Sequence, residues 1–202
     1  MTIETRYDDI LDATVSVLGR RGFHHASIRE IARAADLSLA GLYHYVRGKD
    51  ELVFLAIARA LDDLIAQLDK ALIDARTPEG KLLALIHTHL DFAGSRGGEM
   101  KVINRDYEVL PEPRRSEIVA KRREYLDRGI AILAELDPHE RRREDIVSAT
   151  VLLLGMLNGI ATRPFLRSRD DVTSFAGEVG ALFLYGFLER TAIGPAETIH
   201  DG

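Results

Sequence analysis

Two serines divide residues 27–45 into two short helices. The stretch SIRE (27–30) has the form of a capping box, in which the serine hydroxyl accepts a backbone amide and the glutamate reaches back to the cap. The helix that begins there is expected to end near Ala35, and the tight turn DLS (36–38) separates it from a second helix over residues 39–45. A three-residue turn forces the two helices into contact, so this feature constrains the fold more than any other.

Helical spacing of apolar residues extends through nearly the whole chain, whereas the alternating pattern of strands is almost absent. We therefore predict an all-α fold of about nine helices, with a three-helix unit followed by a larger helical domain. The expected helices are 6–21, 27–35, 39–45, 50–72, 78–93, 98–109, 114–136, 146–161 and 172–189. The expected division is 1–50 for the first domain, 51–194 for the second, and 195–202 for a flexible tail.

The longest apolar run, residues 146–161, is shorter than the roughly 20 residues that a membrane-spanning helix needs. It also contains Ser148, Thr150 and Asn158, so we predict a fully buried helix there and no membrane partner. The N-terminal stretch MTIETRYDDILD is polar and acidic, unlike a signal peptide, and a cytoplasmic location is expected.

The sequence does not contain the residue patterns that disulfides, metal sites and enzyme active sites require. There are no cysteines, which excludes disulfides and thiolate metal sites. His87 and Asp91 are spaced to share one helix face, but two ligands do not make a structural zinc site, and no metal or cofactor is predicted. Neither a paired Glu-x-x-His motif nor a nucleophile motif or glycine-rich phosphate loop occurs, so an enzyme is not expected.

The two short helices are typical of a helix-turn-helix, whose second helix lies in the major groove of DNA. The positions left to face the bases are Ser38, Leu39, Ala40, Gly41 and His44. Side chains able to contact the phosphates are Tyr43 and His44, Lys49 near the start of the long helix, and Ser27 and Arg29 at the start of the first short helix.

Net charge gives this interpretation little support. The chain carries a formal charge of −5, and residues 1–50 hold equal numbers of cations and acids. A helical protein-interaction or ligand-binding module that has lost DNA binding therefore remains an alternative. The two interpretations, a DNA-binding protein and a module without DNA binding, differ in one measurable property, because only the first predicts a salt-dependent affinity for DNA.

Residues 10–57 resemble the N-terminal domain of the TetR family of bacterial repressors. The similarity rests on the stretch GFHHASIREIARAADLSLAGLYHYVRGKDELV, and it implies that Tyr43 and Lys49 hold phosphate. Three positions depart from the family pattern: Leu39 is often basic in relatives, Gly41 replaces a common threonine, and Val46 replaces the usual phenylalanine. The first two leave few side chains for direct base contact, so DNA shape or water contacts are expected to contribute.

The resemblance also implies a homodimer on a double-stranded operator and a small lipophilic effector bound in the second domain. The dimer is expected through the last two long helices, 146–161 and 172–188. Inward candidates for the effector pocket are Phe92, Met100, Ile103, Tyr107, Tyr125 and Met156, with polar candidates His89, Asn104, Asn158 and Arg163. The segments VINRDYEVLP and LLLGMLNGI resemble relatives that respond to acyl-CoA thioesters, while aromatic drugs and other lipophilic effectors stay open.

Overall fold

The computed structural model describes residues 3–139, 141–161 and 169–188, and within these ranges the chain is all-α, as predicted. No helix in the described ranges is long and apolar enough to cross a membrane. The elements are α1 Ile3–His25, α2 Ile28–Ala34, α3 Leu39–Tyr43, α4 Lys49–Asp74, α5 Pro78–Ser95, α6 Gly97–Arg105, the 3-10 helix η1 Tyr107–Val109, α7 Arg114–Leu136, α8 Arg143–Ala161 and α9 Arg169–Leu188. The expected tail and Arg163 lie outside the described residues.

The two short helices form as the caps predict. Ser27 accepts the amide of Glu30 while the Glu30 carboxylate accepts the amide of Ser27, which confirms the capping box. Ser38 caps α3 through the amide of Gly41. α1 is interrupted at Gly22, next to the predicted end of the helix at residue 21: Gly22 forms a non-helical kink with φ 74° and ψ 164°, a conformation that favours glycine, and one further turn carries α1 to His25.

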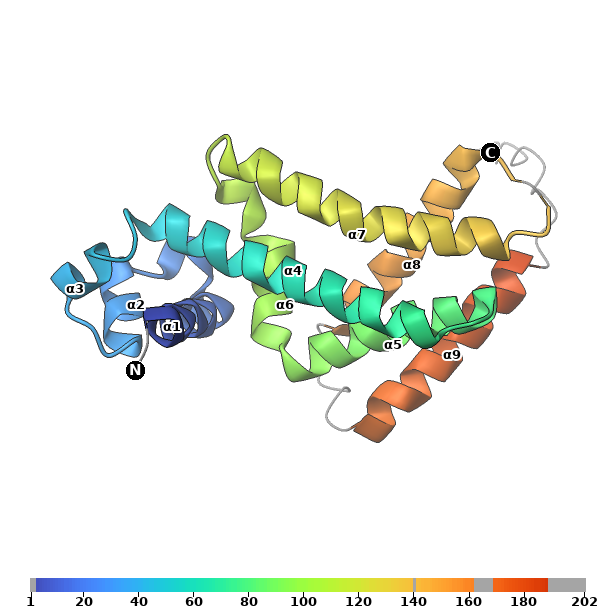
Figure 1. Cartoon of the computed structure of the whole chain (residues 1–202), viewed down its shortest axis with the longest axis horizontal. Coiled ribbons are helices and arrows are strands. Elements are labelled where there is room, and N and C mark those ends of the chain that lie inside the picture. Colours follow the sequence, from blue (N-terminus) through green and yellow to red (C-terminus); the bar gives the residue numbers. More distant parts are fainter. Residues whose placement is uncertain (1–2, 140, 162–168, 189–202) are drawn as a thin grey trace, which may run out of the picture.

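α4 is the axis of the molecule. Figure 1 shows it running from the three N-terminal helices along the length of the chain, with α7 beside it. Its buried face packs on α1 at one end and on α5 and α7 further along. One helix therefore connects the N-terminal unit, α1–α3, with the helical body formed by α5–α9.

The expected helix over residues 98–109 is interrupted. α6 ends at Arg105, and Asp106, with φ −99° and ψ 0°, leads into η1. At the other end, α6 begins at Gly97, one residue before the predicted start at residue 98. A Cβ on Gly19 of α1 would lie 3.4 Å from the Cα of Gly98, so the glycines let α1 and α6 cross closely.

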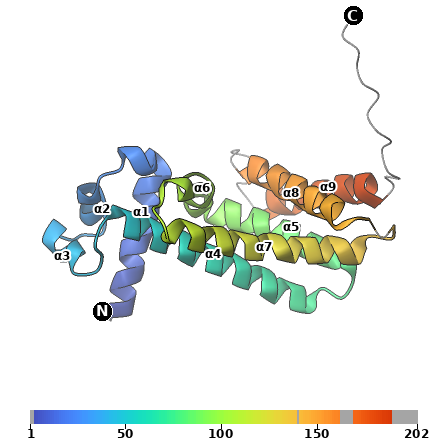
Figure 2. The same ribbon diagram turned by 90° about the horizontal axis from the view of Figure 1, so that it is seen from above.

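α8 and α9 form a layer on one side of the body, over α5 and α7 (Figure 2). The prediction that residues 146–161 form a fully buried helix is wrong for the single chain, because Val151, Leu152 and Met156 are 51%, 63% and 42% exposed. On α9, Leu182 and Tyr185 are 73% and 70% exposed. Only one face of each helix packs on its own chain, and the other face presents large apolar side chains.

Candidate nucleic-acid interface and its connection to the body

α3 is held by a small core and presents its other side outward. Leu42 of α3 and Ile31 of α2 are fully buried, and Leu37 packs against them. Among the predicted base-facing residues, Ser38, Ala40 and His44 are exposed, whereas Leu39 and Gly41 are half-buried. The predicted set therefore lies on one short helix, with its exposed members at the tip of the N-terminal unit (Figure 1).

Of the five predicted phosphate contacts, Tyr43, His44 and Arg29 are exposed, whereas Ser27 and Lys49 make contacts within the chain. Tyr43 is 50% exposed, and Arg29 is exposed beside a cavity of about 370 Å³ that Ser38 and Leu39 also line. The Ser27 hydroxyl, in contrast, donates to Glu30 at 3.0 Å. Hydrogen bonds from the Ser27 backbone and side chain lower the pKa of Glu30, so this acceptor is ionised at neutral pH.

Lys49 has a structural role that the sequence did not reveal. Its ammonium donates to the carbonyl oxygens of Phe23 at 2.8 Å and Ala26 at 3.0 Å, and it lies 4.0 Å from the centre of the Phe23 ring. These contacts tie the α1–α2 connection to the start of α4. An ammonium group has three donors, so one is left for an outside acceptor.

Val46, where the family resemblance implies phenylalanine, is 3% exposed and packs in the core beside the half-buried Tyr45. A smaller residue is therefore accommodated without opening the junction between α3 and α4. This departure concerns packing rather than the DNA-facing side of the unit.

The polar candidates for an effector pocket make one buried contact and one surface contact between helices of the body. The Nδ1 atom of His89 on α5 lies 3.2 Å from the Tyr125 hydroxyl on α7. The amide of Asn104 on α6 donates to the Asn158 side chain on α8 at 2.7 Å. Arg122 donates to the carbonyl of Ile103 at 2.9 Å. These contacts connect α5 with α7, α6 with α8, and α7 with α6; Asn104 is exposed and Asn158 is half-buried.

The apolar candidates divide into two sets. Phe92, Met100 and Ile103 are buried, and Tyr107 is half-buried under the guanidinium of Arg122, 4.4 Å from its ring centre. The expectation that Met156 points inward is wrong for the single chain, since it belongs to the exposed face of α8. α8 has one buried and one exposed apolar face, and spacing alone could not assign Met156 to either.

Burial controls the ionisation of the His89–Tyr125 pair. Desolvation lowers the pKa of His89 to about 4 and outweighs the Asn158 side chain, which acts to raise it; desolvation also raises the pKa of Tyr125. Both groups are therefore neutral at pH 7. The second ring nitrogen of His89, Nε2, is buried and makes no hydrogen bond of good geometry.

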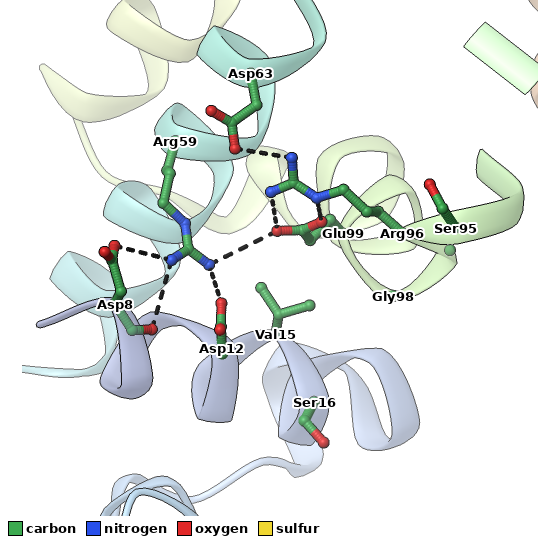
Figure 3. Close-up of a pocket in the computed structure, with 11 residues that line it drawn as sticks. Asp8, Asp12, Val15, Ser16, Arg59, Asp63, Ser95, Arg96, Gly98 and Glu99 are labelled. Atoms are coloured by element: carbon green, nitrogen blue, oxygen red, sulfur yellow. Dashed lines mark hydrogen bonds and ion pairs between the residues drawn. The ribbon is translucent and has the colours of Figure 1, made fainter. Parts of the chain in front are cut away.

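A cluster of charges joins α1, α4 and α6 where the N-terminal unit meets the body (Figure 3). This junction cluster surrounds a cavity of about 670 Å³, and its charged members are Asp8, Asp12, Arg59, Asp63, Arg96 and Glu99. The Arg59 guanidinium pairs with Asp8 at 3.2 Å and with Asp12, and Arg96 pairs with Asp63 at 2.8 Å. Both guanidinium groups also meet the buried carboxylate of Glu99.

The electrostatics of the junction cluster favour the protonated, charged form of Arg59. Burial acts to lower the pKa of Arg59, but hydrogen bonding and charge from Asp12 outweigh this effect and raise it. The cluster was not predicted, because its partners are far apart in sequence. The sequence of α1 shows acids on a helix, a pattern that is usually a solvated face.

A second contact, the α6 clamp, is formed by Arg105 and Asp106. Arg105 donates to the carbonyl of Leu18 at 2.6 Å, and Asp106 is 3% exposed and accepts both Arg105 and the amide of Phe23. The end of α6 is thereby attached to α1 on both sides of the Gly22 kink. No pattern in the sequence indicated this contact.

No group of three or more potential metal ligands occurs in the described ranges. A helix-turn-helix unit with an exposed second helix, carried on a larger helical body, defines a class of DNA-binding regulatory proteins.

Two family models match the chain: "Bacterial regulatory proteins, tetR family" over residues 10–56 and "Tetracyclin repressor-like, C-terminal domain" over residues 75–162. The chain belongs to the TetR family, whose members are DNA-binding transcriptional regulators and not enzymes.

Curated relatives match mainly in the N-terminal part. The chain is 31% identical over 88 residues to the HTH-type transcriptional regulator BetI of Brucella canis, and this match covers 44% of each protein. It is 32% identical over 73 residues to the HTH-type transcriptional repressor KstR of Mycolicibacterium smegmatis, which covers 36% of each. These matches span less than half the length of either relative.

Solved structures match over nearly the whole chain. A TetR-family transcriptional regulator from Bordetella parapertussis has a TM-score of 0.84 and 25% identity, covering 95% of this chain and all of the other. AibR, solved with isovaleryl coenzyme A and operator DNA, has a TM-score of 0.77 and 26% identity, covering 89% and 98%. FadR from Bacillus subtilis, solved with stearoyl-CoA, has a TM-score of 0.73 at 19% identity over 89% and 98%, a likeness that shows the fold alone.

Proposed function

We propose that the protein is a homodimeric transcriptional repressor of the cytoplasm, bound to a double-stranded operator through α2 and α3 and released by a lipophilic effector. The observation that carries the proposal is the exposed tip of α3 on a capped, well-packed helix-turn-helix. Residues 1–50 form the DNA-binding domain in this proposal, and residues 51–194 form the effector-binding and dimerisation domain.

DNA contact is divided between bases and phosphates. Ser38, Ala40 and His44, with the backbone around Leu39 and Gly41, face the base edges, while Arg29, Tyr43 and Lys49 contact phosphate. The Ser27 hydroxyl contributes only if it turns from Glu30, 3.0 Å away. Phosphate contacts fix the orientation of the protein and carry no sequence information.

The exposed apolar faces of α8 and α9 form the dimer interface in our proposal. Val151, Leu152, Met156, Leu182 and Tyr185 supply this surface, and each is more than 40% exposed in the single chain. Contiguous apolar surface of this kind is typical of protein–protein contacts. Two N-terminal units on one dimer suit two half-sites about one helical turn of DNA apart.

The effector occupies the body between α5, α6, α7 and α8, and an acyl-CoA thioester is its proposed class. Two similar structures were solved with such compounds, AibR with isovaleryl coenzyme A and FadR with stearoyl-CoA. An effector releases DNA only when it binds the DNA-incompetent state more tightly. The α6 clamp supports a route for this coupling, because it attaches a helix of the body to α1.

The test is the affinity of the purified protein for DNA upstream of its own gene and for scrambled DNA of equal length, measured by fluorescence anisotropy from low to high salt. We expect selective, salt-dependent binding that acyl-CoA thioesters weaken. The engaged Ser27 and the lack of donors on Leu39 and Gly41 favour one rival, a ligand-binding module without DNA binding. Equal, weak affinity for the two DNAs at every salt concentration supports that rival.

A further inference from the structure

His89 is a buried polar side chain with an unused hydrogen-bonding position. It is 3% exposed, near the middle of α5, and its Nε2 atom has no hydrogen-bond partner. Only one other buried side-chain nitrogen in the described ranges is in this state, the Nε atom of Arg59. Buried polar groups in proteins are almost always hydrogen-bonded, so an exception of this kind needs an explanation.

The contact with Tyr125 determines what Nε2 offers. Burial keeps the Tyr125 phenol protonated, and its hydroxyl makes no other hydrogen bond in the described part of the chain. A phenol O–H is a good donor, and donating to Nδ1 at 3.2 Å gives it an acceptor. In that tautomer the ring proton sits on Nε2; the Asn158 side chain lies near enough to raise the His89 pKa but makes no hydrogen bond of good geometry, so His89 presents a buried N–H donor without a partner.

The polar neighbour of His89 that a ligand would replace is Asn158 of α8. None of the three cavities lined by the junction cluster, by the α2–α3 groove or by the outer face of α9 touches His89. α8 packs on α5 and α7, and its hydrogen bond to α6 is the Asn158–Asn104 contact at 2.7 Å. The Asn158 side chain acts on His89 and raises its pKa against the effect of burial, so a ligand at Nε2 takes the place of Asn158 and breaks its contact with Asn104.

We propose that the Nε2–H group of His89 donates to an uncharged carbonyl oxygen of the effector, which makes the effector an ester or thioester rather than the free acid. This inference rests on the proposed function and specifies the chemistry of its effector site. The group that binds there is neutral because His89, Tyr125 and Asn158 are themselves uncharged, and Arg122, 3.5 Å from the Asn104 side chain, already donates to the Ile103 carbonyl and stacks on Tyr107. Release of Asn104 changes α6 one residue before the α6 clamp.

Ionisation supports the choice of a neutral ligand. A carboxylate would be stabilised by a protonated His89, but the His89 pKa of about 4 makes the protonated form about a thousand-fold disfavoured at pH 7. A carbonyl oxygen accepts from the neutral ring and requires no proton uptake. Ester and thioester ligands are therefore expected to bind more tightly than the acid of the same chain length.

The experiment is isothermal titration of the full-length protein with three compounds for each of two acyl groups, isovaleryl and octanoyl. The compounds are the CoA thioester, the methyl ester and the free acid. Expected results are binding of each carbonyl ester or thioester at least tenfold tighter than the matched acid, and a roughly tenfold weaker affinity in His89→Leu. His87→Leu, two residues away on the same helix and half-buried, is the matched control and should bind like the wild type.

A stability measurement separates a ligand-binding role from a structural one. The double variant His89→Leu/Tyr125→Phe removes both polar groups of the pair, and without ligand it should melt at a temperature no lower than the wild type. A clearly lower melting temperature would show that the pair stabilises the core, and this overturns the inference.

The titrations separate two kinds of failure. If thioesters bind the wild type and release it from DNA but His89→Leu binds them equally well, the inference is wrong and the proposed function stands. If a free acid binds as tightly as its ester, the inference is likewise wrong and the proposed function stands. If no ester or thioester binds the wild type, both the acyl-CoA effector and the His89 assignment are wrong.

Discussion

Lys49 is expected to have two roles: it stabilises the fold and it contacts a DNA phosphate. Its ammonium donates to two backbone carbonyls, at 2.8 Å and 3.0 Å, and lies over the Phe23 ring. Shielded hydrogen bonds from a charged donor contribute about 1.5–3 kcal/mol each, and an exposed cation–π contact contributes about 0.5–1 kcal/mol. Lys49 is only half-buried and water can replace part of these contacts, so we expect Lys49→Ala to destabilise the protein by about 2 kcal/mol.

Lys49→Ala should change two quantities that are measured separately, the melting temperature and the salt dependence of DNA binding. For a chain of this length, a loss of about 2 kcal/mol lowers the melting temperature by about 4–8 °C. Each phosphate contact contributes about 0.9 to the slope of log K against log salt, so a dimer that loses two contacts loses about 1.8. Differential scanning calorimetry measures the first effect, and fluorescence anisotropy across a salt series, well below the melting temperature, measures the second.

Two variants serve as controls for Lys49→Ala. Tyr43→Phe removes a hydroxyl from a side chain that is 50% exposed, so it should weaken binding to all DNA sequences and leave the melting temperature unchanged. Lys70→Ala removes the same charge from an exposed position far along α4 and should change neither quantity. An unchanged salt slope in Lys49→Ala, with the melting temperature lowered, would refute the phosphate contact and leave Lys49 with a structural role alone.

The other predictions concern the dimer, the coupling and the pH dependence of stability. Leu182→Glu puts a charge on the exposed face of α9 and should give a folded chain of 22.5 kDa in sedimentation, where Val119→Glu on α7 should leave the dimer intact. Asp106→Asn breaks the ion pair of the α6 clamp, so an effector should still bind in titration but should weaken DNA binding by a smaller factor. The folded-state pKa of His89, about 4, is below its unfolded value of about 6.5, so the unfolded state binds more protons between them and stability falls as the pH drops through this window, by up to about 3 kcal/mol. Denaturant unfolding from pH 7 to pH 4 should show this loss in the wild type and a flatter profile in His89→Leu, and equal profiles would contradict the assignment.

Local signals predicted the N-terminal unit well. The two serine caps and the three-residue turn fix α2 and α3 within a few residues, because capping depends on neighbours in the sequence. The departure at residue 46 could also be identified from the sequence, and Val46 proved to be a buried core residue.

Long-range contacts could not be predicted in the same way. Nothing local indicates that Arg105 reaches Leu18, or that Arg59 of α4 meets acids of α1, since these contacts depend on how α1, α4 and α6 cross. The apolar residues of α8 go all round the helix, and such a pattern does not tell whether a residue packs on its own chain or on a second one. Met156 was therefore assigned inward, although it lies on the exposed face.

The central claim is that α2 and α3 select a particular DNA sequence. The most direct measurement mixes the purified protein with fragments of its host's genomic DNA at several salt concentrations and sequences the bound fraction. We predict enrichment of a few fragments that share two related half-sites about one helical turn apart, with binding that weakens steeply as salt rises. A bound fraction with the same sequence composition as the input at every salt concentration would contradict the claim.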